Sequence, residues 1–317
     1  MTPPPRKILG RNDITRIQRV NILVLFQVVT EHFIPNFESL LQDQDPLPSY
    51  CLKLLHACVI RHVSVVNILI ERNLIPTLLS MLQSHQTDIT GSVLLNIVGI
   101  LNSILSNREI SFKLISEHGL VEHVTSGFLE VATLIDDDNS NISISPLLLQ
   151  LLDMLHHVLK HVEFAVKSVL NPSNESSTAG PSREKVEVLL HESKSLSELN
   201  GILITLLMYE DSDIQEWACR CLYLSAELFG SEYEEYFTDD NALCLFQALR
   251  EASKKRQKLI LRIIKRFSGC SDDILNIFRK HSSELVGIMN DITKDESDDD
   301  AEAKSIRNLV AELRKLL

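Results

Sequence analysis

One pattern recurs along the chain at a spacing of about 46 residues. NLIPTLLSML at 73–82 and GLVEHVTSGF at 119–128 begin alike, and each follows a short predicted helix that ends in Arg-Asn or His-Gly. NGILITLLMYEDSDIQ at 200–215 opens in the same way. Helical repeats of about 40–47 residues are typical of armadillo and HEAT proteins, in which each repeat stacks on its neighbours. The recurrence therefore predicts an all-α fold, a right-handed α-solenoid of armadillo/HEAT type.

The segment Asp211–Gly230 shows the helical pattern most clearly. Its apolar and small residues fall on one face over several turns: Ile214, Trp217, Ala218, Cys221, Leu222, Ser225 and Leu228. Spacings of three and four residues indicate an amphipathic α-helix. Ser212 and Gln215 have the spacing of a capping box at its start, and Gly230 is suited to end it.

Composition agrees with an all-α chain. Gly and Pro number 10 each in 317 residues, aromatic residues make up 5%, and almost no stretch alternates with the period of two that strands require.

The net charge of −12 argues against general nucleic-acid binding, because neutralising phosphates needs an excess of Lys and Arg. The six cysteines lack the paired spacing of zinc sites, so we expect reduced cysteines in the core.

Domain organisation follows from apolar content along the chain. Residues 1–12 lack the apolar core of a signal peptide and are expected to form a disordered arm. No apolar run reaches the roughly 18 residues of a membrane span, which predicts a cytoplasmic chain with no membrane partner. Residues 171–182, NPSNESSTAGPS, predict a flexible insertion in a repeat array that runs from 13 to 292. An acidic linker at 293–301 and a C-terminal helix at 302–317 complete the expected order.

The first predicted helix, 13–32, is apolar around nearly its whole circumference. Such a helix requires cover on more than one side, whereas the first helix of a solenoid normally has a polar outer face. We therefore expect upstream repeats, a partner or a second copy of the chain to contact it.

The sequence offers few candidates for chemistry. It has no GxSxG elbow, no P-loop and no dinucleotide fingerprint, so we expect no catalytic residue and no cofactor. His157 and His161 share one helix face, but Val158 stands where zinc proteases of the HExxH type place a glutamate. A solvated polar face is the favoured interpretation, with a metal site as the alternative. Importin-like peptide grooves are lined by repeated Trp residues, each followed one turn later by Asn. Here Trp217 is the sole tryptophan and Cys221 follows it, so the sequence argues against a groove of that type.

The most informative polar feature is a basic stretch. Residues 250–266 hold eight Lys or Arg against the single Glu251, in a chain of net charge −12. The buried stripe of this helix is expected to consist of Leu259, Ile260, Ile263, Ile264 and Phe267. The candidate partner-binding residues are Lys254, Lys255, Lys258, Arg262 and Lys265. Three interpretations are open: a solvated face balanced by acidic neighbours, a docking patch for an acidic partner such as a tubulin tail or an acidic peptide, or contact with membrane, nucleic acid or calmodulin.

The acidic run 295–300 also has more than one interpretation. It is typical of a disordered hinge, and it could instead fold back on the basic helix. Ser297 is followed by three Asp, which makes it a candidate phosphosite for an acidophilic kinase.

Three segments resemble a known family: DPLPSYCLKLLHACV at 45–59, LLDMLHHVLK at 151–160 and QKLILRIIKRF at 257–267. They are similar to the C-terminal armadillo-type region of the ULK-four/Runkel kinases, relatives of the Fused kinases. The resemblance extends from about 45 to 290, and its most specific parts are the LPSY and LRIIKR stretches.

This resemblance implies a kinase or pseudokinase domain upstream and a role in microtubule, cilium or cell-division structures. The chain itself lacks the GxGxxG loop, the VAIK-type lysine, HRD and DFG of a kinase. The expected function is a non-catalytic protein–protein interaction scaffold with microtubule-associated or kinase partners, at cytoskeletal or ciliary sites. The alternatives are a regulatory fragment of an active serine/threonine kinase whose catalytic domain lies upstream, and a stand-alone assembly or cargo adaptor.

Overall fold

The computed structural model describes the residues 24, 26–44, 46–85, 88, 91–106, 114–115, 118–135, 144–170, 182–294 and 301–317. Within these ranges every regular element is a helix, so the all-α prediction is confirmed. Several predictions fall outside the described residues: the arm 1–12, most of the first helix, the insertion up to residue 181, the acidic run and Ser297.

The chain divides into two compact units, Met1–Ser80 and Met81–Leu317. The helices of the first are η1 (Val29–Phe33), η2 (Ile34–Asn36), α2 (Phe37–Leu41), α3 (Leu47–Arg61), α4 (Val63–Glu71) and the first part of α5 (Ile75–Ser84). Helix α3 packs on α2 and α4 around side chains that are fully buried, among them Phe37, Leu52 and Leu55. Pro48 occupies the first turn of α3, where its missing N–H leaves no hydrogen bond unmade.

The described end of the first predicted helix is not a regular α-helix. Val29–Phe33 is wound as a π-helix, and Pro35 follows in a 3₁₀ turn. Val29 is buried, whereas Val24 and Val28 are 55% and 48% exposed. Apolar side chains on this segment therefore face solvent within the described part of the chain.

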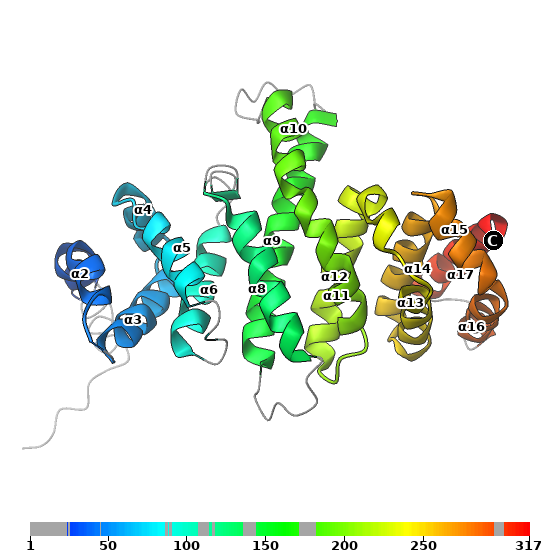
Figure 1. Cartoon of the computed structure of the whole chain (residues 1–317), viewed down its shortest axis with the longest axis horizontal. Helices are drawn as coiled ribbons and strands as arrows, with labels where there is room; N and C mark the ends of the chain where they lie inside the picture. The colour runs from blue at the N-terminus through cyan, green and yellow to red at the C-terminus, as the bar shows by residue number, and fades with distance from the viewer. Residues whose placement is uncertain are drawn as a thin grey trace, which may run out of the picture. The chain divides into compact units, whose positions relative to one another are not determined.

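The second unit contains most of the repeats. Its helices are α6 (Ser92–Leu105), α8 (Leu120–Ile135), α9 (Ser145–Leu170), α10 (Arg183–Glu192), η3 (Ser193–Leu199), α11 (Asn200–Leu206), α12 (Ser212–Phe229), η4 (Gly230–Tyr236), α13 (Asp239–Glu251), α14 (Lys254–Ser268), α15 (Asp272–Lys280), α16 (Ser282–Lys294) and α17 (Ala301–Leu316). Figure 1 shows them following one another in the order of the chain.

These helices form two layers. Helices α6, α9, α12, α14 and α17 pack side by side in one layer, each on the next. Helices α8, η3 with α11, α13 and α16 form the second layer in the same manner. Contacts between α8 and α9, α11 and α12, α13 and α14, and α16 and α17 join the layers. Each pair therefore buries its apolar face against its neighbours, which is how a helical repeat array is stabilised.

The central helix α12 is buried more widely than a single apolar stripe predicts. Cys219, Leu224 and Ala226 are buried although they lie off that stripe, whereas Trp217 and Leu228 are only half-buried. The reason is its place in the stack, because α12 contacts α9, α11 and α14 on different sides.

The cap of α12 also differs from the predicted capping box. The N-cap is Asp211, whose carboxylate accepts a hydrogen bond from the backbone N–H of Asp213 at 2.8 Å. The amide of Gln215 instead donates to the carbonyl of Tyr209 at 2.6 Å. The helix does end before Gly230.

The repeated NLIP and GLVE openings share an unusual backbone. Asn73 has a φ of 55° and Gly119 a φ of 62°, and the buried Leu74 and Leu120 follow them. Glycine and asparagine are the residues that tolerate this left-handed conformation best. Asn200 does not share it, because η3 continues through this residue into α11. The third copy therefore begins differently from the first two.

The cysteines lie in the helical core or at its margin. All six are free thiols, and Cys51, Cys58, Cys219 and Cys221 are buried. Burial raises the pKa of the Cys219 thiol to about 12 and raises the pKa of the Cys221 thiol well above its usual value. These thiols therefore remain protonated and act as small apolar side chains.

Among the described residues, no single helix has the length and apolar character needed to cross a membrane. By length and composition alone, one bent pair, Ser64–Glu71 with Ile75–Ser84, passes that test.

Candidate protein-binding surface

The basic stretch forms α14, whose buried face packs into the stack. Ile260, Ile263, Ile264 and Phe267 are buried as predicted. Leu261 is buried in place of Leu259, which was predicted in the stripe and is half-exposed. The cause is the second neighbour of α14, because the helix packs against α17 as well as α12 and α13.

Two residues of the predicted patch are engaged in ion pairs with neighbouring helices. The Lys255 ammonium lies 3.1 Å from the Glu216 carboxylate on α12. The Lys265 ammonium lies 2.7 Å from the Glu312 carboxylate on α17. Carboxylates of neighbouring helices therefore balance the positive charges of Lys255 and Lys265, although both lysines remain partly exposed.

Arg266, which was outside the predicted patch, has a structural partner. Its guanidinium donates to the backbone carbonyls of Ala226 at 3.3 Å and Glu227 at 3.1 Å. These carbonyls belong to the last turn of α12, where a cation interacts favourably with the helix dipole. Arg266 therefore joins α14 to the C-terminal end of α12.

Lys258 and Arg262 differ from these residues. They lie one turn apart on α14 and are both partly exposed. Within the described residues neither has an ion-pair or hydrogen-bond partner. Lys254, at the first turn, is exposed and does make a contact. Of the predicted patch, Lys258 and Arg262 are thus the cations available to a new ligand.

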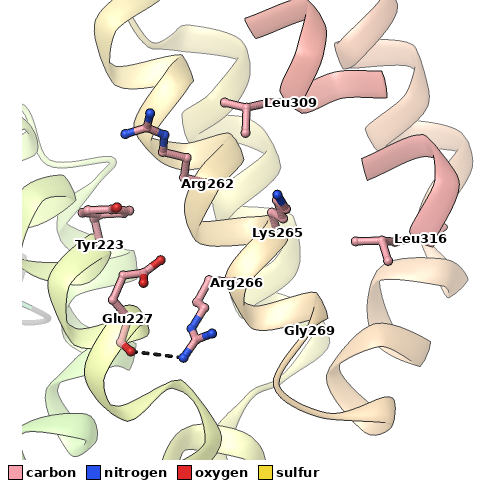
Figure 2. A pocket seen from close by; sticks show the side chains of 8 residues that line it. All are labelled: Tyr223, Glu227, Arg262, Lys265, Arg266, Gly269, Leu309 and Leu316. Carbon is pink, nitrogen blue, oxygen red and sulfur yellow. Dashed lines mark hydrogen bonds between the residues drawn. The ribbon is translucent and has the colours of Figure 1, made fainter. Parts of the chain in front are cut away.

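An open pocket of about 560 Å³ lies along this helix. Figure 2 shows Tyr223 and Glu227 of α12 on one side of α14, and Leu309 and Leu316 of α17 on the other. Arg262, Lys265 and Arg266 reach it from α14 between these walls. The pocket therefore combines apolar side chains with an excess of positive charge.

The pocket residues of α12 and α17 were not predicted from the sequence. Tyr223 lies off the apolar stripe of its helix, and Leu309 and Leu316 are spaced seven residues apart on α17. Their half-exposed state could have been suspected from this spacing, because the fully buried Ile306 and Leu313 already fill the core-facing side. The neighbouring helix that each of these side chains faces is set by tertiary packing, which the spacing of residues does not reveal.

Next to the pocket, charged and aromatic side chains connect α9, α12 and α14. The Glu216 carboxylate accepts hydrogen bonds from Lys255 at 3.1 Å and from Arg220 at 2.8 Å. Burial acts to raise the pKa of Glu216, but these two hydrogen bonds outweigh it and the pKa is lowered. The Arg220 guanidinium also lies 5.1 Å from the centre of the Trp217 ring, a cation–π contact.

His156 extends this group onto α9. Its ring meets Trp217 edge-on, with ring centres 5.1 Å apart. Burial, together with the charges of His157 and Lys160, lowers the pKa of His156 to about 4. His156 is therefore a neutral aromatic side chain at physiological pH.

The alternative of a metal site at the histidines of α9 has no support in their geometry. The His157 ring pairs with Asp153 at 3.6 Å, and His161 Nε2 lies 3.0 Å from the carbonyl oxygen of Leu105. Among the residues that the structure describes, no group of three His, Cys, Asp or Glu is arranged to hold a metal ion.

The two-layer stack defines the class of protein: an α-solenoid of the armadillo/HEAT type, as predicted. An engineered protein from a structural genomics consortium matches with a TM-score of 0.54 at 16% identity, over 89% of this chain and 96% of that one. A designed armadillo repeat protein in complex with the peptide (KR)4 matches with a TM-score of 0.52 at 14% identity, over 88% and 98%. At such identities the likeness concerns the fold alone.

Sequence comparison is more specific. The family model described as "Serine/threonine-protein kinase ULK4-like, HEAT repeats" matches residues 14–67. Serine/threonine-protein kinase ULK4 of Mus musculus is 31% identical over 268 residues, which is 83% of this chain. The chain spans 20% of the length of that relative. The predicted resemblance to the repeat region of ULK4-type kinases is therefore confirmed.

Proposed function

We propose that this chain is a non-catalytic protein-binding scaffold, the repeat module of a ULK4-like protein. The observation that carries the proposal is the pocket along α14, where apolar side chains and Arg262, which has no partner among the residues that the structure describes, are both accessible. A repeat array presents such helix faces on a rigid support, and its function depends on what they bind.

The relation to a kinase is part of the proposal. The relative ULK4 is named a serine/threonine-protein kinase, and this chain corresponds to a fifth of its length. The sequence itself holds none of the motifs that bind ATP or transfer phosphate. We therefore assign the binding of partners to this region, and any phosphoryl transfer to a separate kinase domain.

The finer cellular assignment rests on the family resemblance. On this ground we propose that the scaffold acts in the cytoplasm, at microtubules, cilia or other cytoskeletal structures. A designed armadillo protein in complex with the peptide (KR)4 is an analogy for peptide binding by this fold. The exposed surface of α14 is positively charged, so we expect the partner surface that it binds to be acidic.

Proximity labelling in cells tests the proposal. The natural chain is compared with the double variant Lys258→Glu/Arg262→Glu, and with a control, Arg183→Glu/Lys185→Glu, on the exposed face of α10. The expected result is a set of cytoskeletal or ciliary proteins that is lost from the α14 variant and kept by the control. Equal labelling by all three forms would remove α14 from the function, and no enrichment would contradict the scaffold.

A further inference from the structure

The pocket along α14 has apolar walls that the stack leaves uncovered. Leu309 and Leu316 of α17 both line it, and Tyr223 lines it from α12. All three are half-exposed, whereas Ile306 and Leu313, each three residues earlier on α17 than one of these leucines, are fully buried. A volume of about 560 Å³ lies in the range of sites that hold small ligands or single large side chains.

The three cations of the pocket have different roles. Arg266 is engaged by the carbonyls at the end of α12, and Lys265 by the Glu312 carboxylate. Arg262 alone among them has no such partner within the described residues. Its planar guanidinium can bind a carboxylate through two hydrogen bonds, and Lys258 extends the positive surface by one turn.

Charge selects among possible occupants. Glu227 is the one carboxylate among the described residues that line the pocket, and its negative charge also acts on Lys167 of α9. Positive charge therefore prevails next to Arg262. Within the described part of α14, Lys258 and Arg262 are the two patch cations without a partner, and two are too few for a nucleic-acid or membrane surface, which requires many phosphate contacts. A short peptide needs only one or two such contacts.

We propose that this pocket binds an acidic peptide segment of a partner protein that carries a large apolar side chain. The apolar side chain lies between Tyr223, Leu309 and Leu316, and an adjacent carboxylate pairs with Arg262. This inference rests on the proposed scaffold function and names the class of ligand.

The test measures peptide binding by fluorescence anisotropy with the full chain. The probe is a fluorescein-labelled octapeptide, Asp-Glu-Asp-Leu-Glu-Asp-Glu-Asp, and a second peptide has Ser in place of Leu. Arg262→Gln is expected to weaken binding of the Leu peptide about tenfold, because a charge-assisted hydrogen bond is lost. Leu309→Ser is expected to weaken it severalfold and to abolish the preference for Leu over Ser. The control Arg183→Gln on α10 should bind as the natural chain does.

Equal affinity of the natural chain and Arg262→Gln for the Leu peptide would overturn the inference, and so would the absence of a preference for the Leu peptide over the Ser peptide. Binding to phosphatidylserine vesicles instead of the peptide would also overturn it, in favour of a lipid surface. Thermal unfolding of each variant confirms that the fold is intact. If peptide binding fails while labelling in cells still depends on Lys258 and Arg262, the scaffold proposal stands and the assigned ligand is wrong. If the peptide binds but the natural chain enriches no partner proteins in cells, the scaffold proposal fails and the assigned ligand stands.

Discussion

At the scale of the residue, replacing a glycine by alanine should have opposite effects on stability at two positions of the second unit. Gly119 has a φ of 62°, while the Cβ of an alanine at this position would meet nothing closer than 3.9 Å. Gly119→Ala is therefore strained by its backbone and should lower the free energy of unfolding by about 1–2 kcal/mol. Gly287 lies inside α16, where an added Cβ meets no atom within 4 Å. Gly287→Ala should raise stability by about 0.5–1 kcal/mol.

Urea unfolding of both variants beside the natural chain measures these changes. The pair is its own control, because the same substitution is made at both positions. A loss of stability in both variants, or in neither, would contradict the backbone argument.

A second prediction at this scale concerns pH. Burial holds the pKa of His156 at about 4 in the folded chain, against about 6.5 when unfolded. Below pH 6.5 the unfolded state therefore binds more protons than the folded state, and stability decreases as the pH falls towards 4. His156→Gln should lose less stability over this window, by about 1–2 kcal/mol after allowance for solvent at the half-buried ring. Parallel stability curves of the two proteins between pH 7 and 4 would contradict this.

At the scale of the element, the C-terminal helix α17 completes the pocket. Its buried residues Ala303, Ile306, Val310 and Leu313 hold it against the stack, and it contacts α14 and α16. A helix that packs only on the last repeat can detach without unfolding the others. Leu313→Ala should weaken this docking by about 2–5 kcal/mol, because a fully buried leucine is truncated.

Hydrogen exchange with mass spectrometry measures this detachment. Faster exchange should be confined to α17, and binding of the acidic octapeptide should weaken together with it. The control Lys304→Ala, on the exposed face of the same helix, should leave both unchanged. Faster exchange throughout the second unit would show instead that α17 does not detach locally.

Helices could be predicted from the sequence, but the pocket could not. The spacing of Ile260, Ile263, Ile264 and Phe267 predicts the buried face of α14 because it depends on local geometry alone. The placement of Leu261 in the core depends on α17, which lies about 50 residues further along the chain. Lys265 forms an ion pair because α17 brings Glu312 close to it, and the sequence near α14 does not show this. Charge composition identifies the basic helix, and packing decides which of its cations are available.

At the scale of the whole molecule, the two compact units each have a core. Leu52 is fully buried in the first and Leu245 in the second. Because each unit has its own apolar core, and repeats are stabilised by nearest neighbours, we expect thermal unfolding in two resolved steps. Leu52→Ala should lower the midpoint of one step and Leu245→Ala that of the other, each by several degrees, since either substitution removes about 2–5 kcal/mol.

Differential scanning calorimetry decides between separate and coupled units. With separate units, the total heat of unfolding exceeds the van't Hoff heat of either step, and each substitution moves one peak only. A single transition that both substitutions lower equally would mean that the repeats unfold as one cooperative array. In that case a ligand bound at α14 would stabilise the first unit as well as the second, whereas separate units confine its effect to the second. Adding the acidic octapeptide during the scan therefore measures how far binding at the pocket is transmitted along the chain.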